Sequence, residues 1–313
     1  MDIFKTKNIS PMLIADQKEP FDDNNYIYEL KFDGIRTLLY SDGESIEIRN
    51  KRNKALHPII PELCDLYNNI KGKVILDGEI IVMKRGKPDF YEVQKRALMT
   101  NYSKIELASN MFPITFIAYD IIYQEGNELI DLPLMDRKKI LEEMVITSDR
   151  IAISKVIENK GIALFRLTKK QGLEGVIAKK KQSKYVYGKR TKDWVKFKNM
   201  VDEDYVVLGY IPKQNKMTSL IIGQYNTDME LFYVGHVTLG VSFNQLLQYK
   251  ISKIDKPLIA NVPAGNDDAI WLQPKLVVTV EYMYNDKNNL RQPVFRGFRD
   301  DKLPTECIKY STN

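Results

Sequence analysis

The pattern of apolar segments changes after Lys198, and this change limits the folds open to each part of the chain. Before that residue, short runs rich in Val, Ile and Tyr alternate with a few helical stretches, which predicts a mixture of strands and helices. After it, strand-like runs follow one another at short spacing. Because strands and helices do not alternate strictly, we expect an α+β fold and not a doubly wound parallel sheet.

The 313 residues are predicted to form two domains, residues 1–200 and 201–313. In the first we expect strands at 26–30, 45–49, 74–83, 114–122 and 175–180, and helices at 58–69, 90–102, 136–145 and 160–171. In the second we expect strands at 205–211, 218–225, 230–237, 276–284 and 294–299, with a helix near 243–250. This second pattern suits a small β-barrel of the oligonucleotide/oligosaccharide-binding (OB) type. The acidic cluster at 202–204 is the predicted hinge.

The net charge of +6 comes from one stretch of the chain. Residues 169–198 contain 11 Lys and Arg residues against two acids, Glu174 and Asp193, whereas the rest contains 36 basic and 39 acidic residues. A local excess of positive charge favours an anionic partner.

The rarest residue types exclude several chemistries. Two cysteines and two histidines are too few for a disulfide framework, and a Cys/His zinc site would need all four to converge. A histidine-based triad would need one of two histidines, and neither has a recognisable setting. The N-terminus lacks a signal-peptide pattern, and no apolar run approaches the ~20 residues that span a bilayer. We therefore expect a cytoplasmic protein with no membrane partner.

Neither familiar glycine-rich phosphate loop occurs, so charged side chains must hold any nucleotide. The first candidate is Lys31, which follows a strand-like run and precedes the turn at Asp33 and Gly34. A lysine at a strand end can act as a nucleophile if its pKa is lowered. The alternative is a surface lysine beside an ordinary turn, which this short segment alone favours.

Lys196 and Lys198 are the second candidate. With a period of two they share a strand face with Trp194, while Val195 and Phe197 share the other. Two ammonium groups on one face could bind a phosphate or depress the pKa of a nearby lysine. The alternative is a solvated edge strand whose lysines discourage aggregation.

Glu79 and Glu174 are a third candidate, a pair of carboxylates in apolar segments. A buried carboxylate is costly unless it is paired, hydrogen-bonded or bound to a cation. Mg²⁺ takes oxygen ligands, usually one or two carboxylates plus phosphate oxygens of the substrate. The alternative is a structural salt bridge to a nearby lysine.

The order of these segments resembles the motif series of the covalent nucleotidyltransferases. The chain has Lys-x-Asp-Gly at 31–34, Asp-Gly-Glu at 77–79, Glu-Gly-Val-Ile-Ala-Lys at 174–179 and Trp-Val-Lys-x-Lys at 194–198. With Trp-Leu-Gln-Pro at 271–274 and Pro-Val-Phe-Arg-Gly-Phe-Arg-Asp-Asp-Lys at 293–302, the sequence is similar to ATP-dependent DNA ligases. The similarity is strongest to the ligase domain of bacterial end-joining ligases and to small stand-alone bacterial and phage ligases, and it spans nearly the whole chain.

This resemblance implies a nucleotidyltransferase (adenylation) domain of antiparallel sheets with flanking helices, followed by an OB-fold domain. It implies an enzyme that seals 5′-phosphate/3′-hydroxyl nicks in duplex DNA. Lys31 would attack the α-phosphate of ATP to give Lys31–AMP and pyrophosphate. AMP would then move to the 5′-phosphate, and the 3′-hydroxyl would displace it. The implied cofactors are ATP as AMP donor and Mg²⁺, with Mn²⁺ as the alternative metal.

The resemblance also implies roles for further residues. Those that would contact the nucleotide or metal are Glu29 (adenine), Tyr119 (stacking on adenine, where Phe is common), Glu79 (ribose or outer-shell metal), Glu174 (Mg²⁺), and Lys196 and Lys198 (α-phosphate). Those that would orient the leaving pyrophosphate, after the barrel domain swings over the nucleotide, are Arg299, Asp301 and Lys302. Those that would contact DNA are Arg36, which also belongs to the nucleotide site, and Arg49 at the 5′-phosphate, and Lys184, Lys189, Arg190 and Lys192 elsewhere.

The implied partner is nicked double-stranded DNA, with end-joining or repair proteins as further partners, and the enzyme should act as a monomer at the bacterial nucleoid. Affinity for DNA should fall steeply with salt. An RNA ligase or RNA-capping guanylyltransferase would share the lysine chemistry, and a non-catalytic nucleic-acid-binding module is the alternative from another class. The C-terminal block is more specific than Lys-x-Asp-Gly and favours the DNA ligase.

Overall fold

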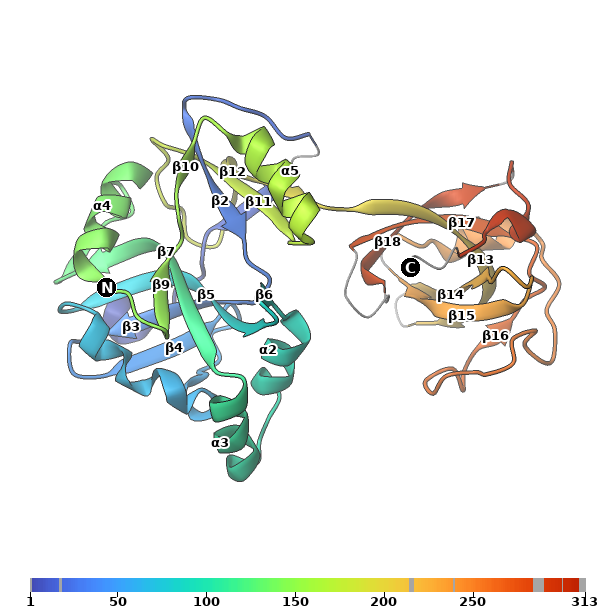
Figure 1. Ribbon diagram of the computed structural model, residues 1–313, viewed down its shortest axis with the longest axis horizontal. Coiled ribbons are helices and arrows are strands. Elements are labelled where there is room, and N and C mark those ends of the chain that lie inside the picture. The colour runs from blue at the N-terminus through green and yellow to red at the C-terminus, as the bar shows by residue number, and fades with distance from the viewer. Residues whose placement is uncertain are drawn as a thin grey trace. The chain divides into compact units, whose positions relative to one another are not determined.

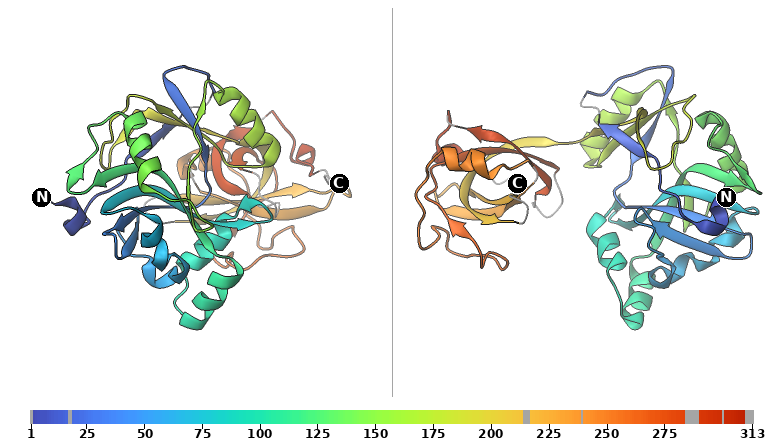
Figure 2. Two further views of the ribbon diagram at one scale, coloured as in Figure 1. Left: turned by 60° about the vertical axis from the view of Figure 1, so that its left-hand side comes forward. Right: turned by 180° about the vertical axis from the view of Figure 1, so that it is seen from behind.

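The computed structural model describes residues 2–16, 19–213, 217–238, 240–283, 290–299 and 301–309. The chain divides into two compact units, Met1–Asn199 and Met200–Asn313, whose elements are labelled in Figure 1 and seen from two further sides in Figure 2. Tyr284 of a predicted strand and Asp300 of the C-terminal motif lie outside the described residues.

The first unit contains a sheet with the strand order β4-β3-β5-β7-β8, in which neighbours are antiparallel. β6 pairs with β5, and β9 runs parallel to β7. One face carries a core that includes Leu76, Phe116, and Val93 and Leu141 from two covering helices. The elements of this layer are β3 (Ile35–Ser41), β4 (Ile46–Asn50), β5 (Val74–Lys84), β6 (Lys87–Pro88), α2 (Phe90–Ala97), α3 (Tyr102–Met111), β7 (Ile114–Gln124), β8 (Asn127–Glu128), α4 (Leu134–Met144) and β9 (Ile151–Ile153).

A second sheet of the same unit has the order β1-β12-β11-β2-β10, with β1 parallel to β12 and the other neighbours antiparallel. A helix, α5, packs on one face over Val176, Val195 and Phe197. It ends at Gly172, whose left-handed backbone closes the last turn. The elements of this layer are α1 (Ile3–Thr6), β1 (Leu13–Asp16), β2 (Tyr26–Lys31), β10 (Ile157–Glu158), α5 (Gly161–Gln171), β11 (Gly175–Lys180) and β12 (Arg190–Lys198).

The other faces of these sheets pack against each other. Ile27 of β2 and Trp194 of β12 are buried in one cluster with Leu38 of β3 and Ile75 of β5. Side chains alternate along a strand, so every second residue of each strand points to one of these two facing surfaces. The polar residues at such positions are therefore brought together around this core.

The second unit contains a sheet with the order β15-β14-β13-β17-β18, and β16 also pairs with β13. The end strands β15 and β18 contact each other, so the sheet curves into a barrel around a core that includes Val207, Ile222 and Val278. Its elements are β13 (Val201–Pro212), β14 (Thr218–Tyr225), β15 (Leu231–Val237), α6 (Phe243–Gln248), β16 (Ile270–Trp271), β17 (Val277–Met283), β18 (Arg291–Arg299) and a 3-10 helix (Pro304–Glu306). The predicted α+β class with mostly antiparallel sheets is therefore confirmed.

The helix predicted at residues 58–69 is wrong in type. This stretch forms 3-10 helices at His57–Ile59 and Pro61–Asn69. Pro61 lacks the N–H that an α-helix would bond to the carbonyl of His57, so an α-helix cannot run through it.

The helix predicted at residues 90–102 is wrong in length. It ends at Ala97, and α3 begins after Asn101, whose side chain accepts a hydrogen bond from the Lys104 amide at 3.0 Å. Asparagine favours such capping positions over helix interiors because its side chain competes for backbone hydrogen bonds.

The acidic cluster predicted as a hinge lies inside β13. Glu203 accepts a hydrogen bond from the Tyr205 hydroxyl at 2.7 Å, and Asp204 accepts one from the Thr279 hydroxyl at 2.6 Å. Because neighbouring side chains satisfy these carboxylates, the acids are accommodated within a paired strand.

Candidate active site

Lys31 of β2 and Lys196 and Lys198 of β12 lie on one face of a sheet, on the two strands that flank β11. Gly175 of β11 lies opposite Lys31 of β2 on one side and opposite Lys198 of β12 on the other. Glu29 of β2 and Lys196 of β12 likewise lie opposite one shared residue of β11, two residues further along the strand. Residues directly opposite each other point to the same face of a sheet, so four charged side chains converge here from two strands.

Lys31 bonds to the predicted carboxylate Glu174. Lys31 Nζ donates to Glu174 Oε2 at 2.8 Å, and the Glu174 side chain is 3% exposed. Gly175, which follows, has φ +147°, and a Cβ there would lie 1.9 Å from the Phe197 carbonyl oxygen, so this close approach of β11 to β12 requires glycine. The salt bridge foreseen as the alternative for Glu174 is present, and its partner is the candidate nucleophile.

Arg36 and Glu79 lie directly opposite each other on β3 and β5 of the other sheet. Arg36 makes a bidentate pair with Asp77, with Nε to Oδ1 at 3.1 Å and Nη2 to Oδ2 at 2.6 Å. The Tyr185 hydroxyl donates to the same Oδ2 at 2.6 Å. The guanidinium of Arg36 is therefore held by buried Asp77, a residue of the Asp-Gly-Glu motif that was not predicted as a site residue.

Glu79 experiences charges from both sheets. Burial raises its pKa to about 7, Lys31 and Arg36 oppose this rise, and Glu174 and Asp77 add to it. A divalent cation would relieve the repulsion between Glu79 and Glu174, so the two carboxylates fit the predicted metal. No group of three His, Cys, Asp or Glu side chains gathers among the described residues.

Tyr119 enters the site through a β-bulge in β7. The partners of Asp77 and Gly78 on β7 are two residues apart, which makes Tyr119 the extra residue. Bulges re-aim a side chain and are frequent beside active sites. The centre of the Tyr119 ring lies 5.5 Å from the Arg36 guanidinium and 4.6 Å from the Lys179 ammonium.

Glu29 is held by two buried lysines that were not predicted as site residues. Lys138 Nζ of α4 lies 2.5 Å from Glu29 Oε1, and Lys179 Nζ of β11 donates to Oε2 at 3.0 Å. Burial opposes ionisation of Glu29, but the two ammonium groups hold its pKa below the ordinary value. Burial lowers the pKa of Lys179 to about 8, against the influence of Glu29. Lys179 is the last residue of the Glu-Gly-Val-Ile-Ala-Lys motif, whereas no local pattern in the sequence distinguishes Lys138.

Arg299, Asp301 and Lys302 lie close together in the second unit. Arg299 makes a bidentate pair with Asp301, at 2.6 Å from Nε and 2.7 Å from Nη2. Arg299 and Lys302 also share Asp204 as an acidic partner. The C-terminal motif thus forms one charged cluster at the end of β18.

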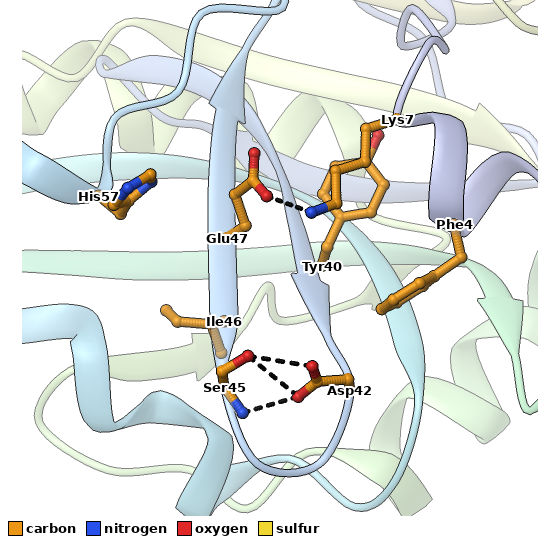
Figure 3. A pocket seen from close by; sticks show the side chains of 8 residues that line it. All are labelled: Phe4, Lys7, Tyr40, Asp42, Ser45, Ile46, Glu47 and His57. Atoms are coloured by element: carbon orange, nitrogen blue, oxygen red, sulfur yellow. Dashed lines mark hydrogen bonds and ion pairs between the residues drawn. The ribbon is translucent and has the colours of Figure 1, made fainter.

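Arg49, the second residue predicted at the 5′-phosphate, is fixed on β4. Its Nε lies 2.5 Å from Glu47 Oε1, and its Nη1 donates to the Asn53 carbonyl at 2.8 Å. Glu47 also pairs with Lys7 at a pocket of about 210 Å³ (Figure 3). The predicted site residues do not line this pocket, whose walls are formed by Phe4, Lys7, Tyr40, Asp42, Ser45, Ile46, Glu47 and His57.

The four remaining candidates for DNA contact, Lys184, Lys189, Arg190 and Lys192, are all exposed. Lys184 pairs with exposed Asp131 at 2.9 Å. Arg190 donates to the carbonyl of Ile14. The structure therefore leaves the group at the surface, and part of it is already engaged within the protein.

Comparison with known proteins gives matches along both units. The model of the family described as ATP dependent DNA ligase domain matches residues 11–198, and the model described as ATP dependent DNA ligase C terminal region matches residues 213–302. The chain is 31% identical over 294 residues to the SPbeta prophage-derived DNA ligase-like protein LigB of Bacillus subtilis, which covers 93% of this chain and 99% of that protein. It is 28% identical over 325 residues to the multifunctional non-homologous end joining DNA repair protein LigD of Mycobacterium tuberculosis, which covers 98% of this chain.

The chain spans 40% of the length of that LigD and 51% of the length of a similar DNA ligase from Archaeoglobus fulgidus. Among solved structures, the ligase domain of M. tuberculosis LigD has a TM-score of 0.54 and 26% identity, and covers 97% of this chain and 99% of that one. A structure of a Lig E DNA ligase, with a TM-score of 0.63 and 17% identity, covers 93% of this chain and 100% of that one and supports the fold.

Proposed function

This chain belongs to the ATP-dependent DNA ligase family, and we propose that it seals nicks in duplex DNA by joining a 5′-phosphate to a 3′-hydroxyl at the expense of ATP. The observation that carries the proposal is the convergence of Lys31 with Glu174, Lys196 and Lys198 on one sheet face. This arrangement supplies a nucleophile, a carboxylate beside it and two further positive charges at the same place.

In the first step, Lys31 Nζ attacks the α-phosphorus of ATP. A P–N bond forms, the bond to pyrophosphate breaks, and the product is Lys31–AMP. The lysine must first lose a proton, and Glu174 is the carboxylate within hydrogen-bond distance. Lys196 and Lys198 face the same region and would neutralise the charge that develops on the α-phosphate. Such transfers depend chiefly on positioning and charge stabilisation.

Glu174 is the proposed ligand of the Mg²⁺ that accompanies ATP, and Glu79 lies near enough to feel the charge of Glu174. Burial is the largest cause of the raised pKa of Glu79, and the negative charge of Glu174 adds to it. The metal, when bound, supplies charge neutralisation as a Lewis acid. We propose Glu174 beside Lys31 as its nearer ligand and Glu79 as a ribose or outer-shell contact.

Adenine would be recognised by Glu29 and Tyr119. Two lysines keep Glu29 ionised, so it can accept a hydrogen bond from an amino group of the base. The bulge in β7 presents the Tyr119 ring as a flat surface for stacking. Lys179 lies over that ring in this structure, so adenine would have to share the ring with this ammonium group or displace it.

The later steps would use the arginines and the second unit. AMP passes from Lys31 to the 5′-phosphate of the nick, and the 3′-hydroxyl then displaces it to close the strand. Arg36 and Arg49, each fixed by a carboxylate, would bind that phosphate, and Arg299, Asp301 and Lys302 would orient the pyrophosphate in the first step. We propose that the enzyme acts as a monomer on nicked duplex DNA. Because LigD is named for end joining, an end-joining or repair protein is the proposed partner at the nucleoid.

Labelling with α-labelled ATP and Mg²⁺ tests this function. We expect wild-type protein to become labelled with AMP and to pass the label to nicked DNA in a chase. The Lys31→Ala variant should take up no label, whereas Lys139→Ala, which removes an exposed lysine of α4, should behave as wild type. A labelled Lys31→Ala protein would disprove the site. Faster sealing of nicked RNA than of nicked DNA would disprove the substrate.

A further inference from the structure

The two cations of the C-terminal cluster share an acidic partner on β13. Asp204 Oδ2 accepts from Lys302 Nζ at 2.8 Å and from Arg299 Nη1 at 3.3 Å. Asp204 Oδ1 accepts from the Thr279 hydroxyl at 2.6 Å. One carboxylate therefore connects both cations to the paired strands β13 and β17.

The Asp204 carboxylate is held in place by the strand pair. Asp204 and Thr279 lie directly opposite each other in the register of β13 and β17, so their bond crosses a hydrogen-bonded strand pair. The Asp204 side chain is 14% exposed, compared with 38% for Arg299 and 27% for Lys302. Asp204 is thus the most buried of the three side chains, and Arg299 and Lys302 extend from it toward solvent.

The cluster holds its cations in a fixed position while leaving hydrogen-bond donors for an anion. Burial opposes ionisation of Asp204, but its bonds to Lys302 and Thr279 hold its pKa below the ordinary value. Two cations are balanced by Asp204 and Asp301, so the cluster is neutral by itself. Within the described residues, these carboxylates use three of the five N–H donors of Arg299. An incoming phosphate can bind the other donors without breaking the anchor.

We propose that Asp204 is a positioning residue for the adenylation step. It holds Arg299 and Lys302 in the orientation from which both bind the pyrophosphate that leaves ATP. Asp204 acts through these cations and does not itself contact the nucleotide. The proposal rests on the ligase function proposed above, because it concerns the step in which Lys31 becomes adenylated.

The Asp204→Asn variant tests this role because it keeps the size of the side chain and an acceptor for Thr279 but removes the charge. We expect adenylation of Lys31 to slow by about 10- to 100-fold, the scale expected when catalytic groups are slightly misplaced. Sealing of a pre-adenylated nick releases no pyrophosphate and should change by less than about twofold. Asp204→Glu, which keeps the charge, should recover part of the rate. Asp202→Asn removes an exposed charge from the same strand face and should leave both steps unchanged.

A double-mutant cycle separates positioning from a general structural effect. In a Lys302→Ala background, Asp204→Asn should slow adenylation by much less than in the wild type, because one of the cations it positions is gone. An undiminished effect, adenylation by Asp204→Asn at the wild-type rate, or equal loss of adenylation and sealing would overturn the proposal. If Asp204→Asn does not fold, Thr279→Val loosens the same anchor and should slow adenylation selectively. A wild-type protein that takes up no AMP would instead contradict the ligase function.

Discussion

At the scale of single residues, the fold alters the ionisation of Glu79. Its pKa is raised to about 7, chiefly by burial. A raised pKa contributes stability that is fully present below the unfolded value, near 4.5, and is lost as the pH rises through about 7. We expect the free energy of unfolding, measured without metal, to fall by about 2 kcal/mol between about pH 5 and about pH 8. The Glu79→Gln variant should lack this part of the fall.

Urea unfolding at a series of pH values measures the effect, with Glu44→Gln, which alters an exposed acid, as the matched control. Mg²⁺ provides a second arm of the experiment. A cation that binds the ionised carboxylate should stabilise the wild type more at high pH than at low pH, and should stabilise Glu79→Gln less. A wild-type profile that coincides with that of Glu79→Gln would show that the carboxyl is not perturbed.

At the scale of elements, the sequence was informative where local periodicity decides the structure. The alternation at residues 194–198 predicted that Lys196 and Lys198 share a face, and the register confirms it. The contacts of Glu29 could not be predicted in this way. Its partners come from α4 and β11, and no local pattern specifies which face of a helix meets a strand more than a hundred residues away in sequence. The bulge at Tyr119 could not be predicted from local sequence either, because it depends on how β7 pairs with β5.

Gly175 is the position at which the packing of elements is least tolerant. A Cβ there would lie 1.9 Å from the Phe197 carbonyl oxygen, a backbone atom that can move only if β11 and β12 separate, and φ is +147°. We expect Gly175→Ala to lower the free energy of unfolding by about 3 kcal/mol, through overpacking and backbone strain together. Gly126→Ala also places a side chain at positive φ, but no atom lies within 4 Å of its Cβ, so it should cost about 1 kcal/mol. The free energies are measured by thermal and urea unfolding. Similar losses for the two variants would mean that β11 and β12 move apart enough to accommodate the added methyl group.

At the scale of the whole molecule, the structure shows how the cations of the basic stretch 169–198 are used. Several of its cations are committed within the protein, since Lys179 is bonded to Glu29, Lys180 to Asp193 and Lys181 to Glu158. Lys196 and Lys198 belong to the candidate active site. The excess charge of this stretch is therefore divided between one buried ion pair, ion pairs at the surface, the candidate nucleotide site and exposed lysines and an arginine outside these pairs.

Lys189 and Lys192 belong to that exposed set, and salt dependence tests whether they contact DNA. Each phosphate neutralised adds about −0.9 to the slope of log K against log salt. If both lysines bind phosphates, the variant Lys189→Gln/Lys192→Gln should reduce the magnitude of that slope by about 1.8. The variant Lys180→Gln/Lys181→Gln removes the same charge from residues that already have acidic partners, and its slope should change less. The decisive measurement is binding of nicked duplex DNA at several salt concentrations. Equal slopes for the two variants would mean that this surface attracts DNA only through its total charge.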